Sequence, residues 1–483
     1  MREAYHYTEF RRRKRVSERF CRNRNCNFGI PQALTAWRDK SRKRMEVIYQ
    51  VLPRIWGNGK FSDWDTPTFD YLKSLGVTAV WYTGIIRHST GMPWVKGDPG
   101  SPYSISDYHD VNPYLSDDPD ARMEEFRSLV KRTHLAGLKV IIDFIPNHVA
   151  PDCKDVSVYP WCDYDWTDTR KIDYSHPDTW LKMNEIALYW AGLGVDGLRC
   201  DMVEMVPLPF LKQLVSEVKK RYPAFLFIGE AYDKSNYPLL IREAGFDLLY
   251  DKSGLYDILR AIICNGASAR NITYNWQGLQ DLQPHMLNFL ENHDEQRFAS
   301  PFYAGDARKA FAAVAAGALF NRSSYMIYAG QEIGIDAAEG SEGRTSIFNW
   351  THPSGLKALF GFIHGKGFQD SNCAMLLERY RSLLRETALP LFRDGQNYDL
   401  CWCNSVATGF DPERHFAFLR YLRAPRKRYA DVALVVCNFS GDAADMTINL
   451  PGDLRSKKEL TRLPAKVSVT VGAWDACILN PVR

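Results

Sequence analysis

The strongest constraint on the fold of this 483-residue chain is a series of eight short apolar runs, separated by segments with mostly helical patterns. The runs are rich in aliphatic and aromatic residues, and they are Glu46–Leu52, Val77–Thr83, Leu138–Val149, Gly194–Asp201, Ala224–Tyr232, Phe246–Asp251, His285–Asp294 and Ser324–Glu332. Near-continuous apolar strands that alternate with helices are typical of a parallel sheet covered on both faces. Eight such units predict an α/β fold whose strands close into a (β/α)8 TIM barrel.

The segments between and after these runs complete the expected organisation. Four of them have a helical pattern, at Thr66–Leu75, Asp118–Ala136, Thr179–Leu193 and Pro207–Arg221. After about Glu386 the pattern changes to short strands separated by turn residues, which predicts a small antiparallel β domain. We therefore expect a barrel at residues 45–385, a short loop domain after its third strand at about 150–171, and a C-terminal β-sandwich domain at 386–483.

Basic residues are concentrated at the start of the chain. Residues 1–44 contain 14 Lys and Arg against 4 Asp and Glu, whereas the remainder contains 47 against 53. We interpret residues 1–44 as a solvated basic N-terminal extension, although its run Arg11–Arg15 could contact nucleic acid or anionic lipid. Because the remainder is net negative, we expect no nucleic-acid partner for the body of the protein.

The cysteines and the hydropathy pattern indicate a cellular compartment. The 11 cysteines are scattered, and Cys21 and Cys26 lack a second pair at zinc-binding spacing. We therefore expect reduced thiols and a cytoplasmic location. No apolar run approaches the length of about 18 residues that a membrane span requires, and no apolar segment follows the N-terminal charges as in a secretory signal. We accordingly expect no membrane partner.

Two charged residues, Arg199 and Asp201, interrupt one of the apolar runs. Side chains alternate along a strand, so these two share a face. We expect the guanidinium to lower the pKa of Asp201 and keep it ionised. Because burying charge is costly unless it is paired or used, the two residues form either a structural ion pair or a held carboxylate that serves as a nucleophile or metal ligand.

Polar residues also stand at the C-terminal ends of other runs. The four polar ends contain Asp143, Asn147 and His148; Arg199 and Asp201; Glu230; and Asn292, His293 and Asp294. In a (β/α)8 barrel these ends meet at one rim, where active sites are built. Carboxylates gathered on one rim repel one another, and this cost indicates a functional site.

The residue types at this rim favour general acid–base chemistry with a carboxylate nucleophile. Neither Cys/His metal spacing nor a phosphate-binding glycine loop accompanies the carboxylates. Glycoside cleavage requires one ionised and one protonated carboxyl group. Arg199 would keep Asp201 ionised, and desolvation by the apolar run before Glu230 would help keep that group protonated.

Together these segments resemble the characteristic regions of the α-amylase family of glycoside hydrolases (family 13). The segments "DFIPNH", "GLRCD", "GE" and "ENHD" occur in the family's order and on the expected strands. "MIYAGQE" is similar to the eighth-strand segment, and "GSPYSISDYHDVNP" to the segment after the second strand. The similarity extends from about Glu46 to the C-terminus.

The resemblance implies a role for seven residues. Asp201 matches the nucleophile that forms a covalent glycosyl–enzyme intermediate, Glu230 the general acid and base, and Asp294 the third carboxylate, which holds sugar hydroxyls. Arg199 would orient the nucleophile. The remaining substrate-binding residues that the resemblance implies are Tyr103, as an aromatic platform, and His148 and His293, as hydrogen-bond partners of sugar hydroxyls.

The resemblance also raises the question of calcium. Asn147 matches a calcium ligand of the family, and the family's usual Lys-His pair after the nucleophile motif offers the ion a carbonyl. Here Glu204 and Met205 replace that pair, and the loop domain that normally brings further ligands is short. We expect no required cofactor, and Ca²⁺ at Asn147 remains an open alternative.

The implied function is a retaining α-glycoside hydrolase that cleaves α-1,4-glucans or maltooligosaccharides. The segment "GDPGSPY" has no Asp at the position where many exo-acting relatives carry one, which disfavours a strict α-glucosidase. A transglycosylase on the same scaffold is the alternative, because a sugar hydroxyl can intercept the same intermediate. A non-catalytic carbohydrate-binding or interaction barrel is disfavoured because all three carboxylates are present. Linkage, chain-length preference, endo or exo action and oligomeric state remain open.

Overall fold

The computed structural model describes residues 45–368, 370–425 and 427–482. Its centre is a closed barrel of eight parallel strands, and each predicted apolar run supplies one of them. The strands are β1 (Val47–Val51), β2 (Ala79–Tyr82), β5 (Lys139–Phe144), β8 (Gly197–Cys200), β9 (Leu226–Gly229), β10 (Leu248–Tyr250), β11 (Met286–Asn288) and β12 (Ser324–Tyr328). Because β1 pairs in parallel with both β2 and β12, the barrel closes and the predicted fold class is confirmed. The proposed N-terminal extension, with Cys21 and Cys26, lies outside the described residues.

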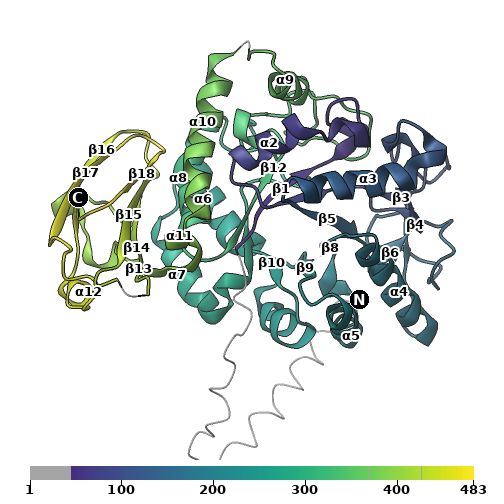
Figure 1. Ribbon diagram of the computed structural model, residues 1–483, viewed down its shortest axis with the longest axis horizontal. Coiled ribbons are helices and arrows are strands. Elements are labelled where there is room, and N and C mark those ends of the chain that lie inside the picture. Colours follow the sequence, from purple (N-terminus) through teal and green to yellow (C-terminus); the bar gives the residue numbers. More distant parts are fainter. Residues whose placement is uncertain (1–44, 369, 426, 483) are drawn as a thin grey trace, which may run out of the picture. The chain divides into compact units, whose positions relative to one another are not determined.

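Helices cover the outside of the barrel, as Figure 1 shows. They are α2 (Thr66–Ser74), α3 (Arg122–Leu135), α4 (Pro177–Gly192), α5 (Leu208–Arg221), α6 (Asp257–Asn265), α7 (Arg270–Leu279), α8 (Ala310–Leu319), α9 (Ser354–Ile363) and α10 (Ser371–Arg385). The strands are therefore buried on both faces, and Ile48, Tyr49 and Val51 of β1 have no exposed surface. This double burial is the physical reason for the near-continuous apolar runs in the sequence.

Helix boundaries follow local capping. The carboxylate of Asp65 accepts a hydrogen bond from the amide of Thr68 and so begins α2, as its position before the predicted helix suggests. The helix predicted from Asp118 begins instead at Arg122, because Pro119–Ala121 forms a separate 3₁₀ turn capped by Asp118. The prediction missed this break because a 3₁₀ turn in line with a helix preserves most of its pattern.

Two short antiparallel strand pairs lie in the loops that follow β2 and β5. In the first, β3 (Ile86–His88) pairs with β4 (Ile105–Val111). In the second, β6 (His148–Val149) pairs with β7 (Arg170–Lys171), which ties together the two ends of the expected short loop domain. The β3–β4 pair was not predicted, because "ISDYHDV" is too polar to be recognised as a strand from its pattern.

The C-terminal part is antiparallel β structure, as predicted. A four-stranded sheet contains β13 (Gln396–Asp399), β14 (His415–Leu422), β15 (Asp431–Asn438) and β18 (Ala476–Leu479), and a two-stranded sheet contains β16 (Ala444–Asn449) and β17 (Lys466–Val471). Two short helices, α11 (Pro390–Asp394) and α12 (Gly452–Arg455), accompany them. The sequence pattern missed β13, whose residues "QNYD" are polar and partly exposed.

None of the helices that the structure describes combines the length and the apolar character needed to cross a membrane.

Candidate active site

A cavity of about 250 Å³ lies where the polar C-terminal ends of the barrel strands meet. Five of the seven sequence-predicted residues line it: Tyr103, His148, Asp201, Glu230 and Asp294. The other two, Arg199 and His293, are buried and contact these lining residues directly. The structure therefore brings all seven residues together, although they come from five separate loops and strands.

Arg199 is the centre of the carboxylate cluster. Its Nη1 lies 2.6 Å from Oδ1 of Asp201, and its Nη2 lies 2.9 Å from Oε2 of Glu230. Nη1 is also 3.6 Å from Oδ1 of Asp143, which lies near the end of β5. The Arg199 side chain has no exposed surface, and the three carboxylates are nearly buried. One guanidinium thus aligns Asp201 and Glu230 on its two terminal nitrogens.

The protonation of these carboxyl groups is governed by burial first. Burial raises the pKa of Asp201 above its ordinary value, and Arg199 opposes this shift. The expectation that Arg199 lowers the pKa of Asp201 is therefore wrong in its net direction, because desolvation outweighs the guanidinium. Burial likewise raises the pKa of Glu230, with Arg199 opposing and the charge of Asp201 reinforcing the rise.

Glu230 is held by two further donors. Tyr232 donates its hydroxyl proton to Oε1 of Glu230 at 2.8 Å, and the amide of Met202 donates to Oε2 at 2.9 Å. Met202 adopts a left-handed backbone conformation, with φ of 43°, directly after Asp201. This conformation is unfavourable for a residue with a side chain, and here it accompanies an amide directed at Glu230.

A second group of site residues contains Asp294, His293 and Tyr103. His293 Nε2 lies 3.1 Å from Oδ2 of Asp294 and 2.5 Å from the hydroxyl of Tyr103, and the rings of Tyr103 and His293 stack at 5.3 Å. Burial and the nearby charge of Arg199 lower the pKa of His293 well below its ordinary value, so the imidazole is neutral. Burial and the charge of Glu230 raise the pKa of Asp294, whose side chain still has 40% of its surface exposed at the cavity.

His148 approaches the cavity from β6. Burial lowers its pKa to about 4, so it is neutral at pH 7. The side-chain amide of Asn147 lies 3.1 Å from its Nδ1. Because an amide N–H donates there, Nδ1 is the acceptor and Nε2 carries the imidazole proton. A neutral imidazole with a free N–H is suited to donating a hydrogen bond to a hydroxyl oxygen.

Several lining residues were not identified from the sequence. They are Lys96, Ser101, Trp166, Asp168, Thr169, Met202, Tyr232, Ile347 and Phe348. The aromatic-rich stretch "YPWCDYDW" was a signal for Trp166, and the position of Tyr232 two residues after Glu230 was a signal for a side chain near that carboxyl group. Phe348 lies in the loop that follows the last barrel strand, β12, and no periodic pattern in the sequence distinguishes it from its neighbours.

Two groups of residues bear on metal binding. Asn147 does not present a free oxygen, because the ammonium of Lys171 contacts its Oδ1 and also lies near Asp163 and the carbonyl of Met205. A calcium ion therefore does not fit at Asn147 while Lys171 is in place. Separately, Asp107, His109 and Asp155 bring ligand atoms within 4.8 Å of one another. That second group is an acidic cluster near the surface, and two of its carboxylates already accept backbone amide hydrogen bonds.

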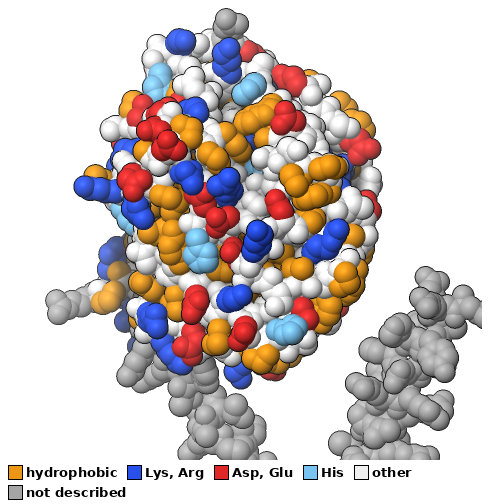
Figure 2. Space-filling view, turned by 90° about the vertical axis from the view of Figure 1, so that its right-hand side faces the viewer, with side chains coloured by type: hydrophobic (Ala, Val, Ile, Leu, Met, Phe, Trp, Pro, Cys, Tyr) orange, Lys and Arg blue, Asp and Glu red, His pale blue; other side chains and the backbone are white. Residues whose placement is uncertain are grey.

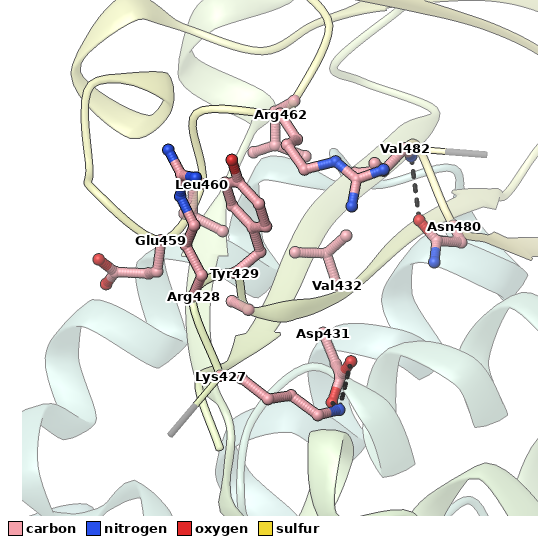
Figure 3. A pocket seen from close by; sticks show the side chains of 12 residues that line it. Lys427, Arg428, Tyr429, Asp431, Val432, Glu459, Leu460, Arg462, Asn480 and Val482 are labelled. Atoms are coloured by element: carbon pink, nitrogen blue, oxygen red, sulfur yellow. Dashed lines mark hydrogen bonds and ion pairs between the residues drawn. The ribbon is translucent and has the colours of Figure 1, made fainter. Parts of the chain in front are cut away.

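A second cavity, of about 390 Å³, lies beside β15 in the C-terminal part. Figure 3 shows the ring of Tyr429 close to two arginines. The guanidinium carbons of Arg428 and Arg462 lie 5.1 Å and 5.2 Å from the centre of that ring. Two of the described lining residues are acidic, and one of these, Asp431, is paired with Lys427. Its described lining residues therefore do not offer a pair of carboxyl groups next to each other, as the barrel site does with Asp201 and Glu230.

Comparison with known proteins agrees with the barrel fold. A sequence model described as "Alpha amylase, catalytic domain" matches residues 62–159 and 161–420, about three quarters of the chain. A crystal structure of an α-amylase from Lactobacillus plantarum superimposes with a TM-score of 0.67 at 22% identity, covering 90% of this chain and 98% of that one. This structural likeness supports the fold.

Two curated relatives show what the chain is similar to. The α-amylase MalA of Haloarcula japonica is 28% identical over 349 residues, which cover 67% of this chain and 47% of the relative. A cyclomaltodextrin glucanotransferase of Geobacillus stearothermophilus is 26% identical over 321 residues, which cover 54% of this chain and 42% of the relative. The chain thus spans less than half the length of either relative.

Proposed function

The chain belongs to the α-amylase family, and we propose that it is a retaining α-glycoside hydrolase that cleaves α-1,4-glucans or maltooligosaccharides. The observation that carries this proposal is the pairing of Asp201 and Glu230 with the two terminal nitrogens of Arg199. Two carboxyl groups adjacent to each other at the wall of one cavity are the arrangement that retaining glycosidases need.

In the proposed reaction, the carboxylate of Asp201 attacks the anomeric carbon while Glu230 gives its proton to the glycosidic oxygen. The bond between the anomeric carbon and that oxygen breaks, and the sugar is left as an ester on Asp201. Glu230, now ionised, takes a proton from water as the water oxygen attacks the anomeric carbon and releases Asp201. Two inversions at one carbon retain its configuration.

The remaining residues would hold the sugar in the cleavage site. We propose that Tyr103 is the aromatic platform and that His148, His293 and Asp294 bind hydroxyl groups. The lowered pKa values of both histidines favour this role, because neutral imidazoles bind hydroxyls without placing a positive charge beside the developing oxocarbenium ion. Arg199 would keep the carboxylate of Asp201 oriented through the ion pair between them.

Transfer to a sugar acceptor is the second candidate. Two aromatic side chains, Tyr232 and Phe348, line the cavity together with Glu230, where an acceptor sugar would enter. A similar relative is named as a glucanotransferase. The same glycosyl–enzyme intermediate would serve both reactions, and the partition between water and sugar decides which one predominates.

Product analysis with maltoheptaose tests the proposal. We expect products shorter than the substrate from a hydrolase, and additional longer products from a transferase. Asp201→Asn should lower turnover by more than about 10⁴-fold and Glu230→Gln by about 10²–10⁴-fold, while the barrel stays folded. The exposed Asp178 provides an Asp178→Asn control that should retain full activity. Equal turnover by wild type and Asp201→Asn would support the non-catalytic alternative instead.

Other parts of the proposal concern surroundings and organisation. We propose an oligo- or polysaccharide substrate as the partner and no nucleic acid, and Figure 2 shows basic and acidic side chains interspersed on the face that it presents.

The nine cysteines in the described part of the chain are free, which supports a cytoplasmic location. We retain domain limits at 44/45 and 385/386, which limited proteolysis would test. Oligomeric state is left open.

A further inference from the structure

We infer that the ammonium group of Lys171 takes the place of a structural calcium ion beside the active site. The family pattern predicts calcium at Asn147, with a carbonyl donated from the segment after the nucleophile. In this chain both of those oxygens instead face Lys171. The inference concerns stability and metal dependence, so it stands independently of the reaction proposed above.

Three oxygen atoms surround the ammonium nitrogen of Lys171. Oδ1 of Asn147 accepts from it, the backbone carbonyl of Met205 lies 3.1 Å away, and Oδ2 of Asp163 lies 3.2 Å away. Asn147 has no exposed surface, and the side chains of Lys171 and Asp163 are 14% and 13% exposed. The site is therefore a nearly buried cage of oxygens around a cation that belongs to the chain itself.

The charges in this cage match an ammonium better than a divalent ion. Asp163 is the one carboxylate among the three contacts, so Lys171 and Asp163 together are neutral. Calcium prefers six to eight oxygen ligands at about 2.3–2.6 Å, and sites with few carboxylates bind it weakly. With the ammonium in place, the oxygens of Met205 and Asp163 lie at hydrogen-bonding distances from nitrogen, as lysine requires.

The three oxygens come from three segments that the ammonium joins. Asn147 follows β5, Asp163 belongs to the loop between β6 and β7, and Met205 ends the 3₁₀ turn η6 (Val203–Met205) that follows Asp201. Lys171 itself pairs with His148 between β6 and β7, so its position is set by backbone pairing. Its side chain therefore connects the loop domain to the turn that follows Asp201, which is what a bound metal would otherwise do.

The sequence departures at this place are consistent with one another. Glu204 and Met205 replace the family's usual pair, yet the carbonyl of Met205 is retained as a ligand. Glu204 turns away from the cage and accepts hydrogen bonds from the amides of Tyr232 and Asp233. The chain thus keeps the oxygen cage of a cation site and supplies the cation from β7.

Thermal unfolding in EDTA and in 10 mM CaCl₂ tests this inference on three proteins: wild type, Lys171→Ala and Lys154→Ala. Lys154 is an exposed lysine of the same loop and provides the matched control. We expect wild type and Lys154→Ala to respond equally little to calcium. We expect Lys171→Ala to unfold roughly 3–6 °C lower in EDTA, because Asp163 loses its ion-pair partner, and to recover part of this loss with calcium.

The decisive quantity is the difference in calcium response between Lys171→Ala and wild type, which cancels any effect of calcium at another site. A variant that responds no more than wild type would overturn the inference. If Lys171→Ala fails to fold in EDTA, refolding yield becomes the readout: recovery only with calcium supports the inference, and failure in both buffers contradicts it. Because the readout is unfolding, its failure is distinct from failure of the proposed glycosidase activity.

Discussion

At the scale of single residues, the guanidinium of Arg199 organises the candidate site. It carries the only positive charge among the described residues that contact Asp201 and Glu230 as ion pairs, and it is itself fully buried. Burial raises the pKa of both carboxyl groups, so neither is tuned by Arg199 alone. The proton on the proposed acid is therefore set by a balance of desolvation, the guanidinium and the donors around Glu230.

Tyr232 is the donor at which this balance is most readily tested. Its hydroxyl stabilises the ionised form of Glu230, so Tyr232→Phe should raise the pKa of Glu230 further. The acid form then persists to higher pH, and the alkaline limb of the kcat/KM profile should move to higher pH. The maximal rate should fall by roughly 10–100-fold, since a hydrogen bond to a charged group is worth about 1.5–3 kcal/mol.

The pH profile on maltoheptaose is the measurement for this residue. Tyr222 is a partly exposed tyrosine at the end of α5, and Tyr222→Phe provides the control, with no movement of either limb expected. A shift of the alkaline limb to lower pH in Tyr232→Phe would contradict the assignment of Glu230 as the acid.

At the scale of elements, Glu204 connects the segments that follow β8 and β9. It lies in η6 and accepts hydrogen bonds from the amides of Tyr232 and Asp233 and from the side chain of Asn236. Asn236 ends the turn η7 (Lys234–Asn236). One carboxylate therefore fixes the loop that carries Tyr232 against the turn that follows Asp201, the proposed nucleophile.

Removing this connection should impair catalysis more than stability. We expect Glu204→Ala to lower kcat/KM by about 10–100-fold, because a loosened loop no longer holds the hydroxyl of Tyr232 against the carboxyl group of Glu230. Glu204→Gln keeps one accepting oxygen and should lose less. The exposed Glu243 provides a Glu243→Ala control with unchanged kinetics. Steady-state kinetics with equal values for Glu204→Ala and Glu243→Ala would show that the connection is dispensable.

At the scale of the whole described molecule, the barrel and the C-terminal sheet share a core. All ten residues of α8 are buried, since this helix contacts both β12 of the barrel and β15 of the sheet. Phe320, which follows α8, packs against Phe416 at 4.7 Å and Phe418 at 5.1 Å, both from β14. The two parts should therefore unfold together.

Phe320→Ala tests this shared core. Loss of a buried ring at the junction should lower the free energy of unfolding by about 3–5 kcal/mol. Urea unfolding followed by circular dichroism and by tryptophan fluorescence should give coincident transitions in wild type. Phe302 is 54% exposed, and Phe302→Ala should be nearly neutral. An unchanged transition in Phe320→Ala would show that the sheet adds nothing to the stability of the barrel.

Local sequence patterns predicted much of the fold and several residues of the candidate site. Each apolar run became one barrel strand, because burial on both faces demands apolar residues at nearly every position of that strand. The polar strand ends led to Asp201, Glu230 and Asp294 because parallel strands bring their C-terminal ends to one rim. Strands without a two-sided core, such as Ile105–Val111 and Gln396–Asp399, lack this signature and escaped prediction.

What only the tertiary structure decided are the properties that depend on burial and on residues distant in sequence. The net rise in the pKa of Asp201 reflects desolvation by its surroundings, which the neighbouring Arg199 could not reveal. The contacts of Lys171 with Asn147 and Met205 join positions 24 and 34 residues apart. The sequence by itself determined that Asp201, Glu230 and Asp294 reach the rim, because each stands at the C-terminal end of a parallel strand. The fold decided which charges they meet there, because electrostatic energy depends on distance and solvent access in three dimensions.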